Sequence, residues 1–74
     1  MSVSTGTAIR ITREMKQDIL GRHWPSWQYK TWRVGNRVII TAVHEKHVVI
    51  SNPRAASTSF SREIIERATQ DKNQ

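Results

Sequence analysis

The chain has 74 residues and no cysteine, and its 12 Lys and Arg against 6 Asp and Glu give a net charge of +6. This length allows one small domain, whose core is modest because a short chain buries only part of its surface. The lack of cysteine excludes disulfides and thiolate-bound zinc as staples, so we expect the chain to gain stability as a homodimer. The positive charge predicts a polyanionic partner, of which nucleic acid is the commonest kind.

Composition along the chain predicts a single domain. Residues 1–7 are polar and predict a flexible tail, residues 8–70 a single α+β domain, and residues 71–74 a frayed C-terminus. The tail lacks the basic flank and apolar core of a signal peptide. The longest apolar runs, Val38–Ile40 and Val48–Ile50, are far shorter than the roughly 18 residues of a membrane span. We therefore expect a cytoplasmic protein that makes no contact with a membrane.

The N-terminal part of the domain predicts a short strand at 8–11 and a helix at 13–20. Thr12 is a good N-cap for this helix, and Gly21 is a good stop signal after its last turn. An apolar residue recurs every fourth position, which places three side chains on one helical face: Ile11, Met15 and Ile19. We expect that face to pack against the core.

The centre of the chain predicts a β-hairpin. Residues 23–28 are expected to form a connector, because Pro25 excludes a regular interior there. The segments 29–34 and 37–43 are rich in β-forming residues, and the Gly35-Asn36 pair between them is typical of a type II′ turn.

The turn fixes the register of this hairpin, so that Trp32 lies opposite Ile39 and Lys30 lies opposite Thr41. A third strand is predicted at 47–51, and its register stays open because the connecting loop does not define it. Both faces of such a sheet are partly apolar. This favours a small closed barrel or a dimer, in which both faces are covered.

The C-terminal part predicts a last short strand at 58–61 and a helix at 62–69. Ser61 is suited to cap this helix. Phe60 and Ile65 occupy the two positions of a hydrophobic staple, which fixes how the chain enters the helix. The complete pattern predicts an α+β fold, in which a small antiparallel β-sheet or small barrel carries a short helix near each end.

Most of the positive charge lies in residues 22–54, which carry six Lys or Arg against Glu45 alone, together with all three tryptophans. Aromatic rings that alternate with cations can stack on bases beside phosphate-binding charge. The candidate nucleic-acid-binding residues of this segment are Lys30, Trp32, Arg33 and Arg37. Two other interpretations of the tryptophans stay open: they fill the core of a small domain, or they bind a protein partner.

No residue pattern indicates an enzyme or a metal site. The three histidines, His23, His44 and His47, lack the cysteine or carboxylate pair that would complete a zinc site. The serines have no nucleophile motif, and no glycine-rich loop is suited to hold a phosphate. The sequence therefore predicts a protein without catalytic residues, cofactor or metal.

The sequence from Gly35 onward resembles the carbon storage regulator family of small bacterial translational repressors. The likeness lies in a strand that opens with Gly, a second strand, and a Ser-x-x-Arg-Glu-x-Ile element, found here at 35–38, 48–50 and 59–65. A weaker likeness links residues 9–13 to the opening strand of that family, which ends in Leu-Thr-Arg.

The resemblance implies an intertwined β-dimer that binds GGA-containing single-stranded loops of messenger RNA. It implies that Arg62 is the key RNA-binding arginine, with Thr12 and Arg13 of the other subunit beside it. The chain departs from the family pattern at Glu14, where the family has a second arginine, and at 16–31, where a helix and a connector are inserted.

These observations together predict a small RNA-binding regulator that represses translation by occluding a ribosome-binding region. The alternative from another class is a phage- or plasmid-encoded inhibitor that binds a host protein through a tryptophan-rich patch. Binding of duplex DNA is less favoured, because no predicted helix has the dense basic face that the major groove requires.

Overall fold

Four strands form one antiparallel sheet whose order follows the chain, β1-β2-β3-β4. The computed structural model describes residues 3–70. The strands are β1 (Ala8–Arg10), β2 (Arg37–Val43), β3 (His47–Ser51) and β4 (Thr58–Ser61), and the helices are α1 (Arg13–Leu20), α2 (Ser26–Tyr29) and α3 (Arg62–Gln70). The predicted α+β class with a small antiparallel sheet is confirmed, and the sheet is open rather than closed into a barrel.

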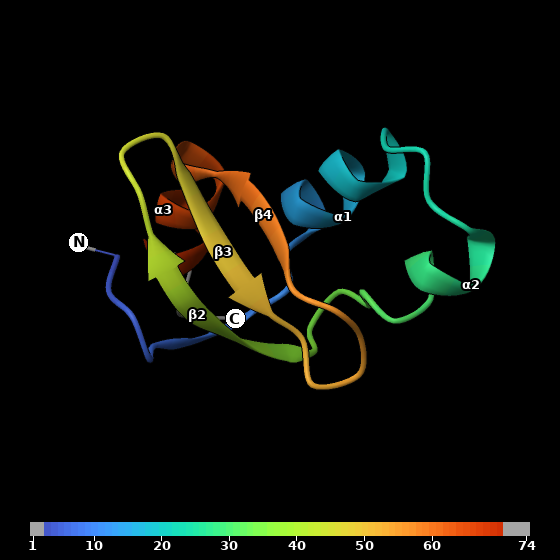
Figure 1. Cartoon of the computed structure of the whole chain (residues 1–74), viewed down its shortest axis with the longest axis horizontal. Helices are drawn as coiled ribbons and strands as arrows, with labels where there is room; N and C mark the ends of the chain where they lie inside the picture. Colours follow the sequence, from blue (N-terminus) through green and yellow to red (C-terminus); the bar gives the residue numbers. More distant parts are fainter. Residues whose placement is uncertain (1–2, 71–74) are drawn as a thin grey trace.

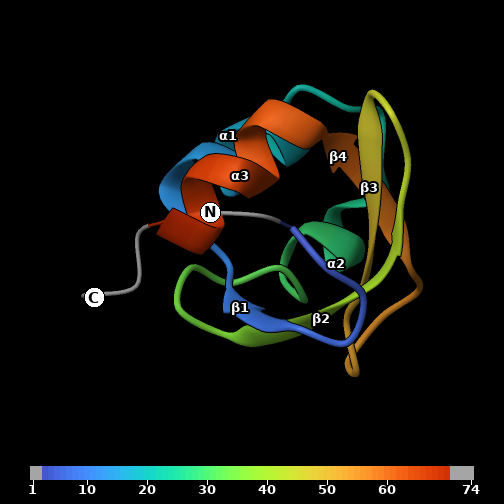
Figure 2. The ribbon, with the colours of Figure 1, turned by 90° about the vertical axis from the view of Figure 1, so that its left-hand side faces the viewer.

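The sheet bends around the core, and the helices close the remaining side (Figure 1). In Figure 2, β1 and β2 form the lower wall, β3 and β4 form the right-hand wall, and α1 and α3 cover the upper left. Helix α3 contacts β1, β3, β4 and α1, so it ties both ends of the sheet together. The inward side chains of the two central strands alternate with outward ones, as a half-buried sheet requires: Val38, Ile40, Val48 and Ile50.

Helix α1 has the predicted bounds and the predicted caps. Thr12 Oγ1 accepts a hydrogen bond from the Met15 amide at 3.2 Å, which satisfies one of the free donors of the first turn. Gly21 ends the helix, and its amide bonds to the Asp18 carbonyl at 3.2 Å. The apolar face predicted from the four-residue spacing is buried in full: Ile11, Met15 and Ile19.

The predicted hairpin of 29–34 with 37–43 is wrong. Residues 29–34 form no strand, and β2 pairs with β1 instead, so that Arg10 rather than a residue of 29–34 lies opposite Arg37. Pro25 opens the short helix α2, and the chain continues in turns up to Gly35. Tertiary packing overrides the β-propensity of this segment, and Trp32 lies fully buried in the core.

The predicted turn with Gly35 and Asn36 at its centre is wrong: the Asn36 amide donates to the Arg33 carbonyl at 3.1 Å, so Val34 and Gly35 are the central residues, and the turn docks against Ile11. Gly35 has a φ of +95°, which glycine adopts without strain. Its amide donates to the Ile11 carbonyl at 2.8 Å, and the Ile11 amide donates to the Asn36 carbonyl at 2.9 Å. These two bonds extend the pairing of β1 with the chain that leads into β2.

The expectation of a flexible tail is wrong for residues 3–7. Val3 is buried with the core residues. The Gly6 amide donates to the Ile40 carbonyl at 2.7 Å, and the Ile40 amide donates to the Thr7 carbonyl at 2.9 Å. These backbone bonds continue the ladder beyond β1, so this segment packs although its side chains are mostly polar. The predicted frayed end, residues 71–74, lies outside the described residues.

The C-terminal elements agree closely with the sequence. The strands at 47–51 and 58–61 are confirmed, and α3 extends one residue beyond the predicted helix. The open question of register is settled by an irregularity between Ile40 and Ala42, after which Val43 pairs with Val48. Phe60 and Ile65, the two positions of the predicted staple, are both buried.

We predict that Trp32→Ala lowers the free energy of unfolding by about 3–5 kcal/mol, because it leaves a large cavity in the core. The matched control is Trp27→Ala, since Trp27 is 64% exposed, and this change is expected to cost about 0.5 kcal/mol or less. Urea denaturation followed by circular dichroism measures both. Equal losses in the two variants would contradict the burial of Trp32.

Candidate nucleic-acid interface

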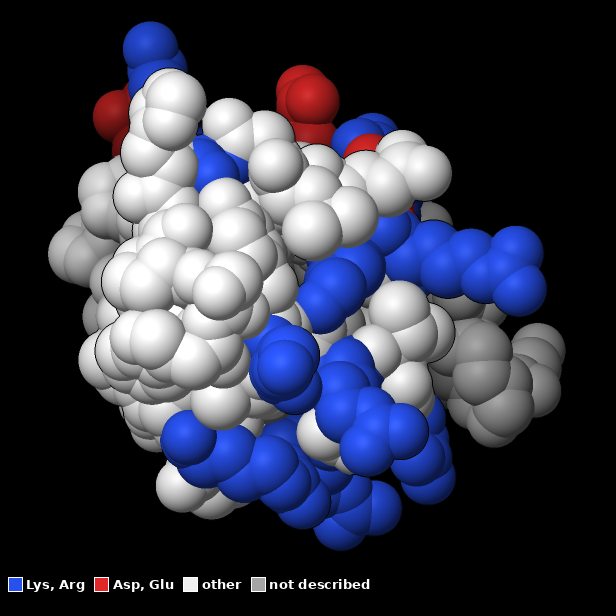
Figure 3. All heavy atoms as spheres, turned by 90° about the vertical axis from the view of Figure 1, so that its right-hand side faces the viewer, with Lys and Arg blue, Asp and Glu red and all other residues white. Residues whose placement is uncertain are grey.

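Five exposed cations lie on segments that strand pairing and hydrogen bonds bring together, and we call them the basic patch: Arg10, Lys30, Arg33, Arg37 and Arg54. Figure 3 shows that Lys and Arg side chains gather on the face that carries α2, with Asp and Glu confined to its upper part. Within residues 3–70, no member of the patch forms an ion pair with Asp or Glu. The positive charge of this face is therefore available to an external anion.

The pairing of β1 with β2 creates the densest point of the patch. Arg10 lies directly opposite Arg37 in the register of the two strands. The Arg10 guanidinium donates to the Gly35 carbonyl at 3.1 Å, which holds it beside the turn that leads into β2. Like charges directly opposite one another destabilise a sheet. The stability of the fold therefore does not explain this pair.

The remaining cations of the patch are placed by a buried amide. Asn52 is the one buried polar residue recorded in the described chain, and its Nδ2 donates to the Thr31 carbonyl at 2.8 Å. Its Oδ1 accepts from the Arg54 amide at 3.0 Å. Asn52 thus joins the loop after β3 to the segment that carries Lys30 and Arg33. Since a buried amide without partners is costly, these bonds hold the two segments together.

Trp32 does not belong to the interface. Its ring is fully buried, with centroids 5.5 Å from Phe60 and 6.4 Å from Trp24, so it offers no face to a base. The prediction that Trp32 binds nucleic acid is wrong, and the open alternative that tryptophans fill the core holds for this residue. A large aromatic ring gains more free energy in the core of so small a domain than on its surface.

Trp27 is the tryptophan that sequence reasoning did not single out. It is 64% exposed on α2 and precedes Lys30 by three residues, a spacing that places two side chains side by side on a helical turn. A ring in this position can stack on a base beside a cation that binds phosphate. A local signal was Pro25, which excludes a regular strand at this point and directly precedes the helix that carries Trp27.

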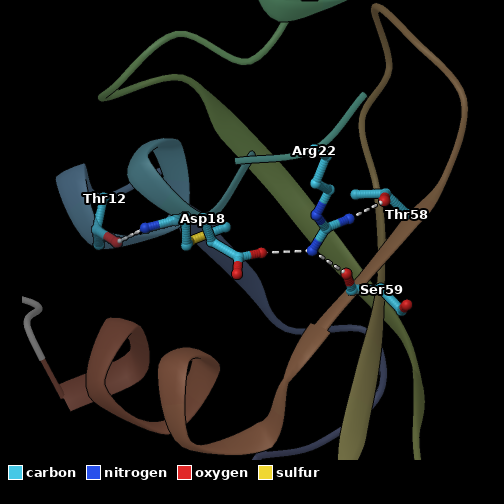
Figure 4. A network of polar contacts seen from close by, with 6 residues as sticks. Thr12, Asp18, Arg22, Thr58 and Ser59 are labelled. Atoms are coloured by element: carbon cyan, nitrogen blue, oxygen red, sulfur yellow. Dashed lines mark hydrogen bonds and ion pairs between the residues drawn. The ribbon is translucent and has the colours of Figure 1, made fainter. Parts of the chain in front are cut away.

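Arg22 lies in the basic segment of the sequence but serves the fold. Its guanidinium bonds to the Asp18 carboxylate, to Thr58 Oγ1 at 2.8 Å and to the Ser59 carbonyl at 2.7 Å (Figure 4). It also lies 5.0 Å from the centroid of the Phe60 ring. Because β4 is an edge strand, these contacts occupy its outer edge. They also anchor the segment between α1 and β2, which we call the connector and which carries Lys30 and Arg33.

The connector itself is held by Tyr29. Its hydroxyl donates to the Arg22 carbonyl and accepts from the Trp24 amide at 3.1 Å. The Tyr29 carbonyl in turn accepts from Lys16 Nζ at 2.5 Å. The Trp24 and Tyr29 rings stack at a centroid distance of 5.9 Å. The segment between α1 and β2 is therefore fixed by side-chain contacts although it contains only one short helix.

The site residues suggested by the family resemblance lie apart from one another within the chain. Arg62 begins α3, where Nε bonds to Glu66 at 3.1 Å and a terminal nitrogen bonds to the His44 carbonyl at 3.1 Å. Thr12 and Arg13 lie at the start of α1. The resemblance places them in different subunits, so their meeting with Arg62 stays a prediction.

The histidines of the turn between β2 and β3 stack on each other. The centroids of the His44 and His47 rings are 4.5 Å apart, and both residues are exposed. Within residues 3–70, no three His, Cys, Asp or Glu side chains come together in a group that could hold a metal ion. No helix in that part of the chain is long and apolar enough to cross a membrane. In comparisons with known proteins, no family model, curated protein or solved structure matches the chain.

We predict that Arg37→Thr raises the free energy of unfolding by about 0.2–1 kcal/mol, because it removes the repulsion between Arg37 and Arg10. Arg37→Lys is the matched control, since it retains the charge and should give no gain. Urea denaturation at low and high salt measures the effect, which should shrink as salt screens the charges. If Arg37→Thr is less stable than Arg37→Lys at low salt, the two arginines do not repel each other in the folded chain.

Proposed function

We propose that this protein binds RNA through the basic patch and regulates translation by occlusion. The observation that carries the proposal is the set of exposed cations without acidic partners, in which two strands place Arg10 opposite Arg37. Phosphates supply the counter-charge that the described part of the chain lacks at this face. A bound domain with a longest extent of 33 Å blocks access to the strand beneath it, so occlusion needs no catalytic group.

The shape of the patch favours RNA over the major groove of DNA. The patch lies on strand ends and turns, whereas α1 and α3 mix acidic and basic residues. A reader of the major groove usually presents one helix with a basic face. Single-stranded loops of RNA follow irregular paths and expose bases for stacking, which suits scattered cations beside the exposed ring of Trp27.

The proposal includes the features implied by the family resemblance. These are a homodimer, a GGA-containing loop as the ligand, and contacts from Arg62 with Thr12 and Arg13 of the other subunit. In support, Arg62 retains donors beyond its two bonds, and its side chain is 38% exposed. Arg13 is exposed at the start of α1.

The alternative of an inhibitor that binds a host protein rests on fewer residues than the sequence suggested. Trp32 is buried and Trp24 is partly buried, so Trp27 is the one tryptophan that a partner can reach in full. A single fully accessible tryptophan is a weaker anchor for an interface than a cluster of rings. Binding of RNA by the basic patch accounts for more of the surface.

We predict that Arg33→Ala combined with Arg37→Ala weakens RNA binding and flattens its salt dependence, by about 0.7 units of slope for each lost phosphate contact. The matched control is Ser4→Glu combined with Thr5→Glu, which lowers the net charge by the same two units. Both residues are exposed in the segment before β1 and belong to neither the patch nor the surroundings of Arg62. Electrophoretic shifts against hairpin RNA over a salt series measure both, and equal losses would exclude the patch as the binding surface.

We predict that Arg62→Ala costs about 1–3 kcal/mol of affinity for a GGA hairpin over scrambled RNA. Its thermal midpoint should change little, because an exposed helical pair such as that with Glu66 contributes about 0.3–0.5 kcal/mol. Glu66→Gln is the control, since it breaks the same pair but keeps the cation. A variant without Arg62 that still discriminates the two RNAs as the parent does would remove the role of Arg62.

A further inference from the structure

A cleft of about 500 Å³ opens beside the basic patch, between β1, the start of α1, the turn at Gly35 and the last turns of α3. This volume lies within the range of sites for small ligands. The bond from Arg10 to the Gly35 carbonyl lies at its edge, so Arg10 belongs to both the cleft and the patch. A strand of RNA on the patch therefore passes the mouth of the cleft.

The polar lining of the cleft is mainly cationic. Arg10, Arg13 and Arg67 line it together with one acid, Glu14. Within residues 3–70, Arg13 has no side-chain hydrogen bond or ion pair, and Arg10 uses one donor of its five. Arg67 is engaged by Glu14 through two bonds of 2.9 and 2.5 Å. Two of the three guanidinium groups thus have free donors for an anion.

Apart from Thr12 and Gly35, the remaining lining is apolar. Ile11 and Ala68 are buried, whereas Val34 is 52% exposed. An aliphatic side chain that remains half in water at the mouth of a cationic cleft gains free energy when a ligand covers it. The cleft therefore combines charge for a phosphate with a surface for a sugar or a base. A nucleotide carries these two groups in one molecule.

We propose that the cleft holds one nucleotide of the bound RNA, with its phosphate between Arg10 and Arg13 and its sugar or base against Val34. This inference rests on the proposed binding of RNA by the patch. It adds a position at which a nucleotide leaves the surface and enters the domain. A free nucleotide has the same chemistry, and the experiments below separate the two sources.

Glu14 limits the affinity of this site. Its carboxylate accepts both bonds from Arg67 and therefore occupies donors that could otherwise add to the contacts of Arg10 and Arg13 with a phosphate. The hydrogen bond from Arg67 lowers the pKa of Glu14, so the carboxylate is ionised at neutral pH and repels a phosphate. Removing this charge releases Arg67 to the ligand.

The first experiment titrates the full ¹⁵N-labelled chain with adenosine 5′-monophosphate, adenosine and inorganic phosphate. We expect the monophosphate to shift the amide signals of Val34, Gly35 and Ala68, and each fragment to shift them at least fivefold less at the same concentration. Equal shifts by inorganic phosphate would reduce the cleft to an anion site and overturn the proposal. The absence of shifts at these three amides would also overturn it.

The second experiment measures affinity for a hairpin RNA and for adenosine 5′-monophosphate in variants of the cleft. Glu14→Gln is expected to raise both affinities about two- to fivefold, and Arg13→Gln to lower them by a similar factor, as for one exposed charge contact. Glu45→Gln is the control, because it removes an equal charge from the exposed turn between β2 and β3. Partial unfolding would lower the affinity, so it cannot produce the gain expected for Glu14→Gln. A loss of affinity or no change in this variant overturns the proposal.

The two proposals fail in different ways. If the variant with Arg33→Ala and Arg37→Ala loses RNA while the monophosphate leaves the cleft unshifted, the cleft proposal fails and RNA binding by the patch stands. If the monophosphate binds but cleft variants bind RNA as the parent does, the cleft is a site for free nucleotides and the inference is overturned. If no RNA binds the parent, the proposed function fails, whatever the monophosphate does.

Discussion

Burial of the Trp32 ring is the constraint on which the rest of the structure depends. The ring lies against Phe60 of β4 and Trp24 of the connector, and no part of it reaches the surface. The segment that carries this ring runs in turns instead of pairing as a strand. The edge of β2 that a hairpin with this segment would use pairs with β1 instead, which places Arg10 opposite Arg37. The packing of Trp32 and the densest point of the basic patch thus accompany the same departure from the hairpin.

Two groups of basic residues have different roles. Arg22, Arg62 and Arg67 are paired with acids on their own or neighbouring helices, and they hold elements together. The basic patch has no such partners within the described chain, and its cations lie on turns and strand ends. Because like charges in register weaken a sheet and surface ion pairs stabilise a fold only slightly, the patch contributes nothing to stability, and this is the basis of the proposed binding of RNA.

The connector between α1 and β2 makes this arrangement possible. It contains one helix of four residues, yet Arg22, Tyr29 and Asn52 fix it to β4, to α1 and to the loop after β3. Such polar contacts are directional, so they set the position of Lys30 and of the exposed Trp27 more narrowly than apolar packing would. A rigid platform loses less conformational entropy when it binds a flexible strand, which favours affinity.

The sequence by itself determined the elements whose signals are local. The four-residue apolar spacing with Thr12 and Gly21 defined α1, runs of β-forming residues defined β2 and β3, and the staple positions Phe60 and Ile65 marked the start of α3. The net charge and its concentration in the centre of the chain were also visible there. Only the tertiary structure decided that 29–34 is not a strand and that Trp27 rather than Trp32 is exposed. It also decided that Arg10 completes the patch. The reason is that strand pairing and burial are set by contacts between residues far apart in the chain, which no local pattern encodes.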